Sequence, residues 1–164
     1  MSTFAALTEW RRAPLWLAGV SLALLGGAFA FQYLGGLAPC PLCHWQRYPH
    51  AAAIVLALGA FSLPGRAGIV LLALAALALL TTAGIGAFHV GVEQRWWAGL
   101  DTCEAATGTV DPKKLLEDVR MGPRCDEVAW SLLGISMAGY NALISGAAGL
   151  LGLVAAAKLA RRPA

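Results

Sequence analysis

The chain has 164 residues, of which 59% are hydrophobic and only 13% are charged, and its mean hydropathy is +0.67. This balance lies far from that of a soluble domain and indicates a membrane protein whose surroundings are the lipid bilayer. The net charge is +3, and the basic residues are scattered singly or in small groups, so the composition excludes the basic patch of a nucleic-acid-binding protein.

Four apolar stretches approach the ~20 residues that a helix needs to cross the hydrocarbon core. They predict helices over residues 15–34, 44–63, 67–92 and 130–157. The first stretch follows two arginines and ends in an Ala-x-Ala pattern, as a secretory signal does. Its apolar run is longer than that of a typical signal, so we expect an uncleaved helix. Small residues such as Gly84, Ser145 and Gly149 suit close packing between these helices.

The connections between the helices set the topology. Residues 63–66, Leu-Pro-Gly-Arg, are too short for anything but a tight antiparallel turn. Basic residues in short segments near helix ends favour cytoplasmic termini. The loops over residues 35–43 and 93–129 then lie outside. The expected fold is an all-α membrane protein, a single antiparallel four-transmembrane-helix bundle over residues 1–164. Its long outside loop is expected to contain a short surface helix from Asp111 to Val119.

All four cysteines, Cys40, Cys43, Cys103 and Cys125, fall in the two expected outside loops. Thiols oxidise readily outside the cytoplasm, so two disulfides are a natural interpretation. A Cys-x-x-Cys bridge closes too small a loop to restrain the unfolded chain much. At the start of a helix, however, the same spacing suits dithiol chemistry, because the helix N-terminus stabilises a thiolate. We therefore predict that Cys40 and Cys43 are redox-active.

Arg47 lies four residues after Cys43, on the same helical face. The unbroken apolar part of this segment, residues 51–63, is too short to span the bilayer. Its helix must therefore begin near Cys43 and carry the arginine into the outer edge of the membrane. Two interpretations remain open. The guanidinium extends to the lipid headgroups, or it meets a thiolate or a carbonyl-bearing redox ligand one turn away.

Two other functions compete for these residues. Cys40-Pro41-Leu42-Cys43-His44 also matches the C-x-x-C-H pattern of a c-type haem site. In such a membrane-anchored electron carrier His44 would be one axial ligand, and His89, Met121 or Met137 the other. That hypothesis leaves Arg47 and the second cysteine pair without a role. A four-cysteine zinc site is disfavoured by the wide spacing of the second pair, so no metal site is expected.

The sequence resembles the bacterial DsbB family, membrane quinone reductases that reoxidise the periplasmic thiol oxidase DsbA. The resemblance covers nearly the whole chain. It is carried by Cys40-Pro41-Leu42-Cys43 with Gln46-Arg47, by the two further loop cysteines, and by the segment Trp-Ser-Leu-Leu-Gly-Ile-Ser-Met at residues 130–137. It implies a quinone-dependent protein-disulfide oxidoreductase of the bacterial inner membrane. The implied partner is a DsbA-like periplasmic thiol oxidase, and the implied cofactor is ubiquinone or menaquinone.

The resemblance also implies a role for each site residue. Cys103 would form the mixed disulfide with the partner, and Cys125 would then attack Cys40. Cys43 would be left as a thiolate facing the quinone, and Arg47 would hold a quinone oxygen. His89 lies near the outer end of the third helix, where the family can place a quinone-site histidine and where an interfacial histidine is also common.

Overall fold

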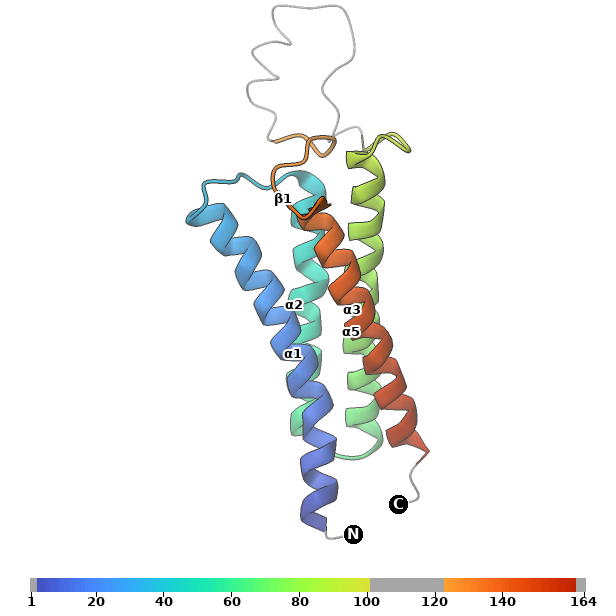
Figure 1. Cartoon of the computed structure of the whole chain (residues 1–164). Coiled ribbons are helices and arrows are strands. Elements are labelled where there is room, and N and C mark those ends of the chain that lie inside the picture. The colour runs from blue at the N-terminus through green and yellow to red at the C-terminus, as the bar shows by residue number, and fades with distance from the viewer. Residues whose placement is uncertain (1–2, 101–122, 162–164) are drawn as a thin grey trace, which may run out of the picture.

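The computed structural model describes residues 3–100 and 123–161. These residues form four helices and one small hairpin (Figure 1). The helices are α1 (Thr3–Tyr33), α2 (Pro41–Ser62), α3 (Arg66–Glu93) and α5 (Met137–Ala160), and the hairpin pairs β1 (Ser131–Leu132) with β2 (Ile135–Ser136). The expectation of a helical bundle is confirmed, with the hairpin as an addition to the predicted all-α fold.

The helices alternate in direction, so the start of α1, the turn between α2 and α3, and the end of α5 lie at one end (Figure 1). α3 packs most extensively, against α2 on one side and α5 on the other. The tight turn between α2 and α3 contains Gly65 at φ 76°, a left-handed conformation that glycine adopts without strain. The predicted antiparallel connection at residues 63–66 is therefore confirmed.

Three helices in the described part of the chain are long and apolar enough to cross a membrane: Arg11–Tyr33, Arg66–Glu93 and Met137–Ala160. α2 lies outside this group because polar residues occupy its first half. It begins at Pro41, and Cys40 caps it by accepting a hydrogen bond from the Cys43 amide. Its start near Cys43 agrees with the sequence argument, whereas its crossing of the bilayer stays a prediction.

Two predicted helix boundaries were wrong. α1 begins at Thr3 rather than at residue 15, and it continues through Pro14. α5 begins at Met137 rather than at residue 130, because Leu133 and Gly134 have φ of 52° and 78° and form the turn of the hairpin. Ser136 then caps α5 by accepting from the Gly139 amide. The surface helix expected over residues 111–119 lies outside the described residues.

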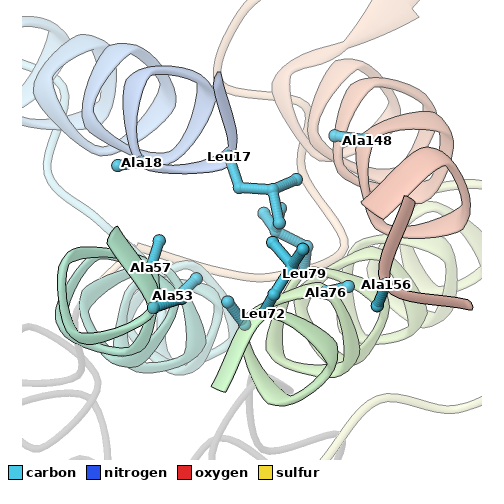
Figure 2. Close-up of a cluster of buried hydrophobic side chains, with 11 residues drawn as sticks. Leu17, Ala18, Ala53, Ala57, Leu72, Ala76, Leu79, Ala148 and Ala156 are labelled. Atoms are coloured by element: carbon cyan, nitrogen blue, oxygen red, sulfur yellow. The ribbon is translucent and has the colours of Figure 1, made fainter. Parts of the chain in front are cut away.

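The core is built from small side chains around a few leucines. Figure 2 shows Leu17 of α1 and two leucines of α3 surrounded by alanines of α2, α3 and α5. Glycines bring α3 and α5 still closer. A methyl group at Gly149 would meet the Ala76 carbonyl oxygen at 2.9 Å, and one at Gly86 would meet the Ala138 carbonyl oxygen at 2.9 Å. Gly84, expected to pack in this way, instead faces open space.

Candidate active site

The cysteine pair lies at the first turn of α2. Among the described residues Cys40 and Cys43 are free thiols, and their sulfur atoms are 2.8 Å apart. Cys40 is 4% exposed and Cys43 is half-buried. The Cys40 thiol donates toward the Cys43 sulfur, and the Cys43 amide donates back to the Cys40 sulfur at 3.3 Å. A disulfide bond measures about 2.05 Å, so only a small movement would be needed when an oxidant removes two electrons and two protons from the pair.

His89 of α3 faces the same sulfur. Its Nε2 lies 3.6 Å from the Cys40 sulfur, and its Nδ1 lies 3.1 Å from the amide nitrogen of Gln46. That nitrogen also donates to the Leu42 carbonyl, which fixes the orientation of the Gln46 amide. Nδ1 of His89 must therefore accept, and the proton of the neutral ring lies on Nε2, toward Cys40. The third helix thus places a ring N–H beside the cysteine pair, whereas the role of His89 toward a quinone stays a prediction.

Arg47 is held on the α1 side of the cysteine pair. Its Nη1 donates to the side-chain oxygen of Gln32 at 2.6 Å, and its guanidinium lies 4.9 Å from the centre of the Phe29 ring. Its Nε is buried and has no hydrogen-bond partner within the part of the chain that the structure describes. A buried donor without a partner is unusual and indicates a contact that the described residues do not supply.

A second polar cluster continues from Gln46 toward the middle of the bundle. The Asn141 amide of α5 donates to the side-chain oxygen of Gln46 at 2.7 Å and to Thr82 of α3. Its oxygen accepts from Ser145 at 2.8 Å and lies 2.9 Å from Nε2 of His50. The contacts form one continuous chain from Cys40 to His50.

A cavity of about 410 Å³ joins these residues. Its volume lies in the usual range for small-molecule sites, and its wall is mostly apolar with a few convergent polar groups. One side is formed by α1, and the other by the start of α2, the end of α3 and the start of α5. The polar side chains along it include Cys40, Cys43, Gln46, Arg47, His50, His89 and Asn141.

Comparison with known proteins identifies the type of chain that carries this site. Residues 10–155 match the family described as "Disulfide bond formation protein DsbB". The chain belongs to the DsbB family. It is 33% identical to "Disulfide bond formation protein B" of Burkholderia pseudomallei over 140 residues, which cover 82% of each chain. It is 30% identical to "Disulfide bond formation protein B 1" of Burkholderia lata over 154 residues, 92% of this chain and 90% of the relative. No solved structure matches it.

In this DsbB-family chain Cys125 lies beside the Cys-x-x-Cys pair. It is disulfide-bonded and fully buried, and it belongs to the same buried cluster as Cys40, Leu42 and Val92. A backbone hydrogen bond also joins Cys125 to His89. Cys103 lies outside the described residues. The sequence predicted both residues in an outside loop, and the structure brings Cys125 to the first pair.

The cysteine pair and His89 also bring together three side chains of the types that bind metal ions. The Cys40 and Cys43 sulfurs and a ring nitrogen of His89 lie within 4.8 Å of one another. Two thiolates on one tetrahedral zinc ion would be about 3.8 Å apart, given Zn–S bonds of about 2.3 Å. The observed separation of 2.8 Å is too short for that geometry and suits a dithiol that closes to a disulfide. The site of this DsbB-family protein is therefore better matched to thiol chemistry.

Sequence reasoning missed several residues of the site. Gln32 contacts Arg47, Thr82 and Asn141 contact Gln46, and His50 ends the polar chain. A signal for two of them was present, because Thr82 and Asn141 are polar residues within otherwise apolar helices, and such residues often mark functional sites. Glu93 was also missed. It lies 4.0 Å from Nε2 of His89 and accepts a hydrogen bond from Ser136.

Proposed function

We propose that this protein is a thiol:quinone oxidoreductase that reoxidises a DsbA-like periplasmic dithiol oxidase and passes the electrons to a membrane quinone. The observation that carries the proposal is the position of the Cys40–Cys43 pair. It lines a mostly apolar cavity between helices that can cross a membrane, together with the unpartnered Nε of Arg47. Family membership supports the disulfide half of the function, and the cavity supports the quinone half.

The residues along the cavity fit a quinone. A flat, apolar ring suits the α1 wall, which includes Leu24, Gly27 and Phe31. A carbonyl oxygen suits the buried Nε–H of Arg47, because a hydrogen bond from a guanidinium is charge-assisted. When bound, a quinone supplies an acceptor for the two electrons and two protons that a dithiol releases on becoming a disulfide. Ubiquinone and menaquinone share this chemistry.

The two sulfurs have different roles in the reduced pair. The hydrogen bond to Cys43 and burial raise the pKa of Cys40, so Cys40 keeps its proton. That S–H points at the Cys43 sulfur and stabilises negative charge there. Cys43 is therefore the sulfur that faces the cavity as a thiolate, with Arg47 one turn further along α2.

The exchange steps follow the order that the resemblance implies. A partner thiolate attacks Cys103, which breaks the Cys103–Cys125 bond and releases Cys125. Cys125 then attacks Cys40, breaks the Cys40–Cys43 bond and leaves Cys43 as a thiolate. The partner's second thiol releases Cys103, which takes Cys125 back from Cys40. Two electrons thus move from the partner to the Cys40–Cys43 pair. The burial of Cys125 in one cluster with Cys40 supports the internal transfer.

The energetics require a strong final acceptor. Thiol oxidases of the DsbA type have reduction potentials of about −120 mV. Their reoxidation therefore needs a stronger oxidant than the disulfides of ordinary cellular thiols, and a membrane quinone can act as that oxidant. We place the protein in the bacterial inner membrane with four crossings, both termini cytoplasmic and the cysteines periplasmic. This orientation gives the soluble partner access to the outside loops and gives the quinone access from the bilayer.

The test is quinone consumption by the purified protein in the presence of a reduced DsbA-like oxidase. We expect the absorbance of a short-chain quinone to fall in a reaction that Cys40→Ser or Cys43→Ser abolishes. His44→Leu is the matched control, because His44 is exposed on α2 and does not line the cavity. Quinone consumption that persists without either cysteine would overturn the proposal. A covalent haem, seen as added mass and a Soret band, would favour the C-x-x-C-H alternative.

A further inference from the structure

His50 lies three residues beyond Arg47 on α2 and lines the same cavity. Its side chain is 4% exposed, and its Nδ1 has no hydrogen-bond partner among the residues that the structure describes. Leaving a buried polar atom unpaired is unfavourable, so a nitrogen of this kind beside a ligand-sized cavity indicates a contact with the ligand. The proposed chemistry so far gives His50 no role.

The hydrogen-bond network fixes which nitrogen of His50 carries the proton. The Asn141 amide nitrogen donates to the backbone carbonyl of Thr82 at 3.3 Å, and a carbonyl can only accept. The Asn141 oxygen therefore lies on the other side, 2.9 Å from Nε2 of His50. An amide oxygen also only accepts, so Nε2 must be the protonated nitrogen. The neutral ring is left with a lone pair on Nδ1.

Among the described residues that line the cavity, Arg47 and His50 each have one buried side-chain atom without a partner, and these two atoms have opposite character. Nε of Arg47 only donates, and Nδ1 of His50 only accepts. They belong to residues about 4.5 Å apart along the helix axis. A quinone carries two carbonyl oxygens, which accept but do not donate, so it satisfies Arg47 alone. A hydroquinone carries hydroxyl groups, which both accept and donate, so it satisfies both residues.

We propose that His50, held in one tautomer by Asn141, binds a hydroxyl group of the hydroquinone and makes the cavity selective for the reduced ligand. The inference rests on the proposed function and deepens it. Tighter binding of the hydroquinone raises the reduction potential of the bound quinone/hydroquinone couple. It therefore favours electron transfer from the Cys40–Cys43 pair to the quinone. His50 would then be a binding residue for the product, and Asn141 a positioning residue that acts through it.

The experiment measures binding rather than turnover. In the full-length protein with Cys40→Ser and Cys43→Ser no electrons pass to the ligand, so short-chain quinone and hydroquinone can be titrated separately under anaerobic conditions. We expect His50→Leu to weaken hydroquinone binding about 5- to 10-fold, the usual effect of one lost hydrogen bond, and quinone binding less than about 2-fold. His50→Gln retains a donor for Asn141 and an acceptor for the cavity, so it should keep part of the selectivity.

His44→Leu, the same substitution on the exposed face of α2, should leave both dissociation constants unchanged. Thermal unfolding of each variant shows whether the bundle is intact. If His50→Leu weakens both ligands equally, weakens neither, or weakens quinone more, the inference is wrong while the proposed function stands. If the parent protein binds neither ligand, the proposed function fails, and the inference fails with it.

Discussion

At the scale of single residues, the direction of each hydrogen bond distinguishes side chains of similar type. His89 presents an N–H to Cys40, whereas His50 presents a lone pair to the cavity, because different amide groups hold the two rings. The backbone amide of Cys43 likewise donates to the Cys40 sulfur. In each case a neighbour with fixed donor or acceptor character determines what the side chain offers to a substrate.

Arg47 provides a prediction at this scale. We expect Arg47→Ala to raise the KM for quinone about 10- to 100-fold, because a charge-assisted hydrogen bond contributes about 1.5–3 kcal/mol. Arg47→Lys should have a smaller but measurable effect, since lysine keeps the charge and loses the planar fork. A steady-state quinone titration gives these values, and a single-turnover exchange between Cys103 and the partner should stay near normal. An unchanged quinone dependence in Arg47→Ala would mean that the arginine only anchors α2 at the membrane surface.

At the scale of elements, the spacing between α3 and α5 determines the geometry of the polar chain. Asn141 reaches both Thr82 and Gln46 only because Gly86 lets α5 approach the backbone of α3. The hairpin before α5 adds a second constraint. Ser136 caps α5 and donates to Glu93 at the end of α3, so the two helices are joined near the cysteine pair.

Two neighbouring glycines test this packing. Gly86→Ala places a methyl group 2.9 Å from the Ala138 carbonyl oxygen and 3.3 Å from the Asn141 amide nitrogen, and the backbone contact has no side chain that can move away. We expect it to lower the free energy of unfolding by about 1–3 kcal/mol, the usual cost of overpacking, and to lower the thermal midpoint in detergent. Gly84→Ala, with no atom within 4 Å, should be neutral or slightly stabilising. Equal effects of the two substitutions would contradict the proposed close contact.

At the scale of the whole molecule, the antiparallel bundle gathers the redox groups at one end. The loop before α2 and the segment before the hairpin both lie at this end (Figure 1). Residues of both segments line the cavity, and Cys125 shares one buried cluster with Cys40. At the opposite end lie the α2–α3 turn, the start of α1 and the end of α5 (Figure 1). In the proposed function, electrons from the soluble partner therefore reach the cysteine pair through Cys125, and the lipid-soluble acceptor takes them from the cavity.

The order of thiol exchange is a prediction for the whole molecule. Cys125→Ser should accumulate a mixed disulfide between Cys103 and the partner, because the resolving thiol is missing. Cys103→Ser should accumulate none, because the burial of Cys125 shields it from a protein-sized partner. Non-reducing gels with mass spectrometry of the linked peptides distinguish these outcomes. A mixed disulfide through Cys125 in the Cys103→Ser protein would reverse the two roles.

The pattern of neighbouring residues along the chain was enough to predict much of the fold. The apolar stretches predicted four helices, and the residues at 63–66 predicted the tight turn, because helix length and turn chemistry depend on neighbouring residues. The short apolar run after Arg47 predicted that α2 starts near Cys43. The spacing of Cys40, Cys43 and Arg47 predicted two thiols and a charge on one face of α2, and their redox role stays a prediction. The late start of α5 was missed, because the apolar residues around Leu133 and Gly134 suit either a helix or a hairpin and the positive φ angles decide between them.

The tertiary structure alone decided the chemical character of the cavity. His50 and Asn141 are 91 residues apart in sequence, and Arg47 and Gln32 belong to different helices. A lone polar residue in an apolar stretch shows that a partner is needed, but it does not show which helix supplies that partner. Whether a ring nitrogen donates or accepts depends on that partner, so the tautomer of His50, the free Nε of Arg47 and the approach of Cys125 to Cys40 all follow from how the helices pack.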